Sequence, residues 1–214
     1  MFSSIDYTQT DRDDLMVLMI RRTEQETAVM EAMSVIYSPT TRAKLADTLN
    51  ALGMRNANGN PFAGADIKPI IGVLKRKGLA VRVDNKIACS GAVVELLTRR
   101  LVDEGRFETM AQAVENADQI RMQTATWGYR RHEDLLSDFR IALYRNDAQR
   151  VLDILESIEA YQPYDTVLPY HQICCNPFDT EWFASLDPTL QASAMEDILA
   201  EISSRLEPID EYLD

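Results

Sequence analysis

The sequence has few of the features that would place it in a specialised class. Its 214 residues include only three cysteines, too few for a disulfide framework, which favours a reducing compartment. The longest apolar run near the start, Leu15 to Ile20, has six residues, whereas a membrane span needs roughly 18. Acidic rather than basic residues precede this run, so it does not have the form of a secretory signal. We therefore expect a cytoplasmic protein with no membrane partner.

Motifs of nucleotide binding and catalysis are also missing. The chain has neither a G-x-x-x-x-G-K-[ST] loop nor a G-x-G-x-x-G turn, and it has no nucleophile elbow. His171 with Cys174 and Cys175 supplies half of a structural zinc site, so packing is the favoured interpretation of these residues. We predict that the protein is not an enzyme and that it has no catalytic residues, metal site or cofactor.

The composition is that of a globular protein, but its charge is unevenly distributed. Hydrophobic residues make up 46% of the chain, enough for one or two cores. The formal net charge is −12, yet residues 40–100 carry 11 basic and 4 acidic side chains. Residues 101–214 carry 8 basic and 23 acidic side chains. This segregation indicates two modules with different partners.

The pattern after residue 22 predicts two helices. Thr23 and Glu26 have the spacing of a capping box, and the helix that follows has a single buried stripe formed by Val29, Ala32, Met33 and Ile36. Ser38-Pro39 ends this helix. Thr40 or Thr41 caps the second helix, which ends at Gly53.

A third helix and a hairpin are predicted next. The loop from Arg55 to Pro61 precedes a helix that we expect to be capped by Asp66, with Pro69 in its first turn. Gly78 ends that helix, and residues 79–83 and 86–89 read as two strands joined by a tight turn. Three helices followed by a hairpin are the order of a winged helix-turn-helix. We assign it to residues 23–90, after an N-terminal arm at 1–22.

The remainder, residues 91–214, is predicted to be an acidic helical domain, which makes the whole chain mainly α. Apolar periodicity indicates a first helix that ends near residue 105. It also indicates four further helices, which cover about 107–123, 132–145, 148–160 and 189–206. The helices at 132–145 and 148–160 read as an antiparallel hairpin. Residues 161–188 hold four of the eight prolines and are expected to form a long, partly ordered connection.

Part of the chain resembles known DNA-binding domains. The residues that carry this resemblance are Leu45-Ala-Asp-Thr-Leu49-Asn-Ala-Leu-Gly53, Arg55, Gly59, Pro61-Phe62, Ile67, Leu74 and Gly78-Leu79. They resemble winged-helix domains and the helix-turn-helix segment of large serine recombinases, without that family's catalytic domain. The segment from Phe139 to Ile158 resembles a tetratricopeptide-type helix pair. The combination is similar to the non-catalytic amino-terminal part of large bacterial ATPases, which implies a piece of a longer protein.

Basic residues cluster on the third predicted helix. At 100° per residue its buried isoleucines centre about 110° from Lys68 and about 170° from Arg76, which places both cations on the exposed side. A recognition helix presents such a face to the major groove, where lysine and arginine read guanine or hold phosphate. Gly72 on this face permits close approach of the backbone. The predicted DNA-contacting residues are Arg42, Lys44, Arg55, Lys68, Gly72, Lys75, Arg76, Lys77, Arg82 and Lys86.

Three functional hypotheses follow. The first is a protein that binds double-stranded DNA, such as a transcription regulator, with residues 91–214 serving protein interaction or dimerisation. The alternative is a winged helix that docks a protein partner and does not bind DNA, because the acidic half would repel DNA. The third is a regulator that senses a small molecule among the aromatic residues of 161–183.

Overall fold

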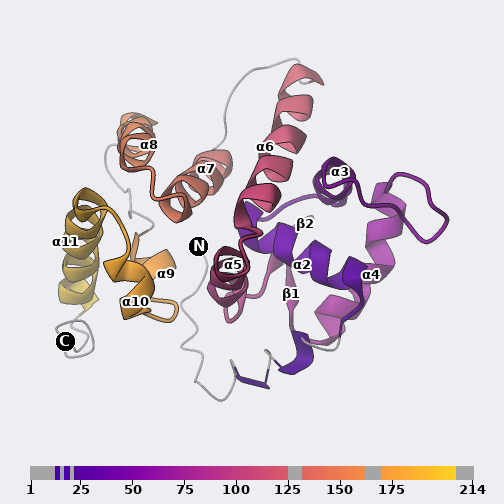
Figure 1. Ribbon diagram of the computed structural model, residues 1–214, viewed down its shortest axis with the longest axis horizontal. Helices are drawn as coiled ribbons and strands as arrows, with labels where there is room; N and C mark the ends of the chain where they lie inside the picture. Colours follow the sequence, from indigo (N-terminus) through magenta and orange to yellow (C-terminus); the bar gives the residue numbers. More distant parts are fainter. Residues whose placement is uncertain (1–12, 15–16, 20–21, 125–131, 162–169, 206–214) are drawn as a thin grey trace. The chain divides into compact units, whose positions relative to one another are not determined.

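The computed structural model describes residues 13–14, 17–19, 22–124, 132–161 and 170–205 (Figure 1). These residues are mainly helical and include one small antiparallel sheet, which confirms the predicted class at this coarse level. The chain divides into two compact units, Met1–Ser137 and Asp138–Asp214. Most of the predicted N-terminal arm lies outside the described residues.

The first unit contains most of the elements predicted in the amino-terminal half. In chain order they are α2 (Glu24–Ile36), α3 (Arg42–Ala51), α4 (Gly64–Arg76), β1 (Ala80–Val83), β2 (Lys86–Cys89), α5 (Val94–Asp103) and α6 (Phe107–Thr124). The next helix, α7 (His132–Tyr144), spans the division between the units.

The predicted caps of the first two helices are confirmed. At the start of α2 the Glu26 N–H donates to the Thr23 hydroxyl and the Thr23 N–H donates to the Glu26 carboxylate, each over 3.2 Å. At α3 the Lys44 N–H donates to the Thr41 hydroxyl over 3.2 Å. Gly53 follows α3 with φ 76° and the Met54 N–H donates back to the Leu49 carbonyl, so the helix ends in a glycine motif.

The third helix begins earlier than predicted. Its N-cap is Ala63, and Asp66 lies in the first turn, where its carboxylate accepts the Ala63 N–H over 2.8 Å. The prediction that Asp66 is the N-cap is therefore wrong. Asp66 is the third residue of the helix, and from there its carboxylate accepts the N–H of the N-cap residue. Pro69 consequently falls in the second turn rather than the first, where its missing N–H removes one hydrogen bond within the helix.

The hairpin forms in the predicted register. Ala80 pairs with Cys89 and Val83 pairs with Lys86, so the turn consists of Asp84 and Asn85. Asp84 has φ 53°, a left-handed conformation that aspartate tolerates better than most side chains. The connection between α2 and α3 joins this sheet, because the Thr40 N–H donates to the Ile87 carbonyl over 2.7 Å and the Ile87 N–H donates back over 2.9 Å.

Helix α2 lies at the centre of the first unit (Figure 1) and packs against α3, α4, α5 and α6. All nine of its residues from Ala28 to Ile36 are buried, so the predicted single buried stripe is wrong. The reason is that α5 and α6 cover the side of α2 that sequence periodicity assigned to solvent. These two helices belong to the first compact unit, whereas the predicted domain boundary lay at residue 90.

The second unit is built from α8 (Ala148–Tyr161), α9 (Tyr170–Cys174), α10 (Thr180–Ala184) and α11 (Pro188–Arg205), with the end of α7. The connection predicted at 161–188 thus contains two short helices in its described part. Asn146 fixes the end of α10, since its side chain accepts the Asp187 N–H over 2.6 Å and donates to the Ser185 carbonyl. Helix α9 packs against α11, and the ring of Tyr170 meets that of Phe139 edge-on at 5.0 Å.

Candidate functional site

Helix α4 separates its apolar and basic residues onto opposite sides. Ile67, Ile70, Ile71 and Leu74 are buried against the core, and the exposed fraction of each is 9% or less. Four cations of the helix and its C-cap are exposed, namely Lys68, Lys75, Arg76 and Lys77. None of these four makes an ion pair with any residue that the structure describes. They are available to an external partner.

Arg42 joins this surface from the neighbouring helix. It is exposed at the first position of α3, and a Cβ built on Gly64 would lie 3.7 Å from the Arg42 Cβ. The amino-terminal ends of α3 and α4 are therefore adjacent, and both helix dipoles favour an anion near them. We call Arg42, Lys68, Lys75, Arg76 and Lys77 the basic face.

Lys44 does not belong to this face, contrary to the prediction. Its side chain is largely buried, and its ammonium lies 2.6 Å from a carboxylate oxygen of Asp118 on α6. The predicted contact of Lys44 with DNA is therefore corrected. This cation joins two packed helices, and moving it to an external phosphate would leave Asp118 without its partner.

The loop between α3 and α4 is held by asparagine side chains. Asn50 clamps it, donating to the Phe62 carbonyl over 3.0 Å and accepting the Phe62 N–H over 2.7 Å. The Asn56 carboxamide oxygen accepts the N–H groups of Asn58 and Asn60, each over 3.0 Å. Arg55 is exposed beside this loop, and its guanidinium donates to the Met54 carbonyl. The loop therefore fixes where α4 begins.

The two predicted contacts on the hairpin have partners within the protein. Arg82 is exposed, but its guanidinium donates to the Asp84 carbonyl over 2.6 Å and to the Asn85 side chain over 3.1 Å. Lys86 is half-buried at the first position of β2. The hairpin consequently offers less free positive charge than α4 does.

Gly72 lies in the middle of α4, on the basic side. A Cβ built there meets only the Arg76 guanidinium, at 3.7 Å, so the protein itself has room for a side chain. Glycine in a helix interior costs about 0.5–1 kcal/mol relative to alanine. Packing among the described residues does not explain that cost, because none of them fills the space that a side chain at Gly72 would take.

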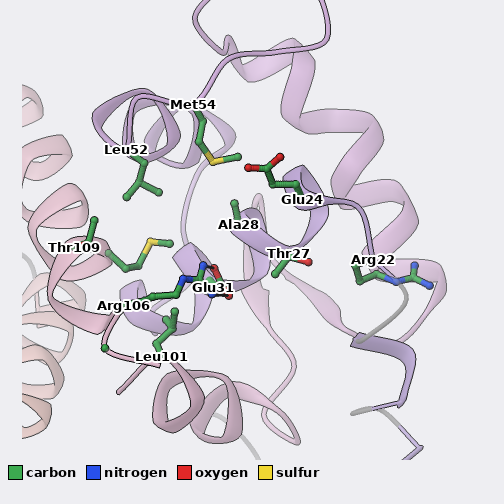
Figure 2. Close-up of a pocket in the computed structure, with 12 residues that line it drawn as sticks. Arg22, Glu24, Thr27, Ala28, Glu31, Leu52, Met54, Leu101, Arg106 and Thr109 are labelled. Atoms are coloured by element: carbon green, nitrogen blue, oxygen red, sulfur yellow. Dashed lines mark hydrogen bonds and ion pairs between the residues drawn. The ribbon is translucent and has the colours of Figure 1, made fainter. Parts of the chain in front are cut away.

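A cavity of about 460 Å³ opens in the first unit at a different place (Figure 2). Its apolar walls come from α2, α5, α6 and the segment after α3, and they consist of Ala28, Leu52, Met54, Leu101 and Met110. Its polar lining consists of Arg22, Glu24, Thr27, Glu31, Gly105, Arg106 and Thr109. Sequence reasoning did not find this cavity. The available signal was Glu31, a charge inside the apolar run of α2.

The charged floor of this cavity is internally neutralised. Glu31 is only 2% exposed, and its two carboxylate oxygens accept from Arg106 over 2.5 and 2.9 Å. Arg106 also donates to Glu104 over 2.8 Å, and Glu104 accepts from Arg100 over 2.6 Å. The hydrogen bond to Glu31 raises the pKa of Arg106, and the hydrogen bonds from Arg100 and Arg106 lower the pKa of Glu104.

The aromatic residues of the second unit pack against one another. Tyr170 is fully buried on Phe139, the rings of Trp182 and Tyr144 lie 4.9 Å apart, and those of Phe178 and Phe183 lie 5.3 Å apart. Cys174 is also fully buried. These contacts favour the interpretation of the described aromatics as core rather than as an open ligand surface.

Two searches of the described residues gave negative results. No described helix is long and apolar enough to cross a membrane. Within the same ranges, no group of three or more histidine, cysteine, aspartate or glutamate side chains is placed to hold a metal ion.

Comparisons of the chain with protein-family models, curated proteins and solved structures found no match. The resemblances to winged-helix domains, serine recombinases, tetratricopeptide repeats and bacterial ATPases thus stay predictions. The case for a function depends on the geometry of the site.

Proposed function

We propose that the protein binds double-stranded DNA through the basic face, with α4 as the recognition helix of a winged helix-turn-helix. The observation that carries this proposal is the set of exposed cations on α4 and at the start of α3 that have no partner in the described structure. Cations of this kind neutralise phosphates and release bound counterions.

The topology supports the same proposal. A winged helix has three helices followed by a hairpin, and in this chain the segment between the first two helices also pairs with the second strand at Thr40 and Ile87. Between its cations α4 has three small residues, of which Ala65 and Pro69 are exposed and Gly72 is half-buried. A flat strip between cations suits a helix that enters the major groove.

The acidic helical part of the chain is proposed to serve protein interaction or self-association. We narrow this role from residues 91–214 to residues 138–214, since α5 and α6 form part of the first unit. The combination fits a transcription regulator. The rival function, a winged helix that docks only a protein, draws on the same basic face, so binding of DNA is the measurement that separates the two.

The test is fluorescence anisotropy of labelled duplex DNA with the full chain at several salt concentrations. We expect affinity to fall as salt rises, and the double variant Lys68→Gln/Arg76→Gln to weaken binding. The matched control is Arg100→Gln/Arg150→Gln, which removes the same charge from residues that do not belong to the basic face and should bind like the original protein. Absence of binding at low salt would overturn the proposal and favour the protein-docking function.

A further inference from the structure

The cavity beside α2 is separate from the proposed DNA-binding surface and has the size of a small-molecule site. Ligand pockets typically measure about 300–1,000 Å³ and are mostly apolar with a few polar groups. This one measures about 460 Å³. Two methionines, Met54 and Met110, line it. Methionine thioethers are flexible, so they adapt to a ligand, and they make favourable contacts with aromatic rings.

The charges around the cavity indicate the sign of the ligand. Arg106 is balanced by Glu31 and Glu104, so it does not attract an anion strongly. The guanidinium of Arg22 lies 3.8 Å from the carboxylate of Glu26, and Figure 2 shows the Arg22 side chain pointing away from the cavity.

Glu24 differs from these residues. It is exposed at the first position of α2, and its carboxylate has no hydrogen-bond or ion-pair partner among the described residues. In Figure 2 this carboxylate points toward Met54, at the apolar wall. A carboxylate with no partner among the described residues therefore lies next to an apolar surface that includes the Met54 sulfur.

We propose that this cavity binds an organic cation with an aromatic body, such as an arylalkylamine. The ring packs between Met54 and Met110, and the ammonium group pairs with Glu24. Thr27 and Thr109 also line the cavity, and a threonine hydroxyl can accept from an ammonium group or its bound water. This site requires neither DNA binding nor the second unit.

The experiment compares three probes that share an indole ring but differ in charge: tryptamine, tryptophol and indoleacetate. Isothermal titration calorimetry of the full chain should show the order tryptamine, then tryptophol, then indoleacetate. Glu24→Gln should weaken tryptamine binding by about threefold or more and leave tryptophol binding unchanged, as expected for a partly exposed ion pair. Glu156→Gln, which removes an exposed helical carboxylate in the second unit, is the matched control and should change neither.

A second variant tests the location. Thr109 is exposed at the cavity, so Thr109→Trp should fill the space without disturbing the core, and circular dichroism checks that the fold is kept. We expect this variant to lose binding of tryptamine and tryptophol alike. The proposal is overturned if no probe binds up to about 10 mM, if indoleacetate binds as well as tryptamine, or if a folded Thr109→Trp variant binds tryptamine normally.

Discussion

The two units differ in how they accommodate charge that folding removes from water. In the first unit the buried Glu31 on α2 is paired with Arg106, which lies between α5 and α6, and the largely buried Lys44 on α3 is paired with Asp118 on α6. In the second unit Asp197 on α11 is partly buried, and its carboxylate accepts the backbone N–H of His171. Burial, together with the nearby Glu201, raises the pKa of Asp197 to about 6.

Within the first unit, the cations that pair with a buried or partly buried carboxylate differ from those of the basic face. Lys44 and Arg106 each pair with a carboxylate from a distant segment and hold the fold together, whereas the cations of the basic face have no counterion among the described residues and are free to act on a partner. Stability in the second unit should instead respond to pH. Four predictions, taken from the largest expected effect to the smallest, test this comparison.

The largest effect is expected from Arg106→Ala, which leaves Glu31 buried without its cation. Breaking a buried pair usually costs about 3–5 kcal/mol, and we expect about 2–3 kcal/mol here because half of the Arg106 side chain is exposed. Urea denaturation measures this loss. A loss below about 0.5 kcal/mol would contradict the view that the pair of Glu31 and Arg106 stabilises the fold.

The second effect concerns the basic face. Lys68→Ala and Arg76→Ala should each weaken DNA binding by about 1–3 kcal/mol if the side chains touch bases, and should relax sequence preference. Lys77→Ala at the C-cap should weaken all duplexes alike and lower the salt slope by about one, because it neutralises a phosphate. All three variants should keep the unfolding free energy within about 0.5 kcal/mol, since exposed side chains without partners contribute little.

The contrast between these two groups of cations also marks what the sequence could predict. Local signals located the longer helices, the Thr23 cap, a second cap at Thr40 or Thr41, and the hairpin, because each depends on residues within a few positions of one another. Lys44 looked like the other cations of residues 40–100. Its partner Asp118 lies 74 residues away in sequence, and the spacing of apolar residues does not indicate a contact between residues so far apart.

The same reason explains the two corrections around α2. Its fully buried surface and the packing of α5 and α6 arise from contacts between distant segments, which the spacing of apolar residues does not encode. The cavity beside α2 is a product of that packing, so its one local signal in the sequence was Glu31, a charge inside the apolar run of α2. The start of α4 was misplaced for a local reason, because Asp66 is an equally good signal at the N-cap and in the first turn.

The third effect is the pH dependence of the second unit. Because the pKa of Asp197 is raised in the folded state, the folded protein binds the proton more tightly, and this contribution is complete below about pH 4 and lost as pH rises through about 6. Asp197→Asn should therefore stabilise the protein at pH 7.5 by about 1–2 kcal/mol, after allowance for solvent screening, and should have little effect near pH 4. Denaturation of both proteins across this range gives the difference directly. Equal gains at both pH values would contradict this assignment.

The smallest effect, at Gly72, separates stability from function. Gly72→Ala should raise the unfolding free energy by about 0.5–1 kcal/mol, because alanine favours a helix interior and the Cβ meets no atom closer than 3.7 Å. If the α4 backbone approaches the duplex at this point, the same methyl group should weaken DNA binding while the protein becomes more stable. Gly53→Ala is the control, since its φ of 76° makes alanine unfavourable and the variant should lose stability without any effect specific to DNA. A Gly72→Ala protein that is more stable and binds DNA unchanged would place the duplex against the flanking cations rather than against the centre of α4.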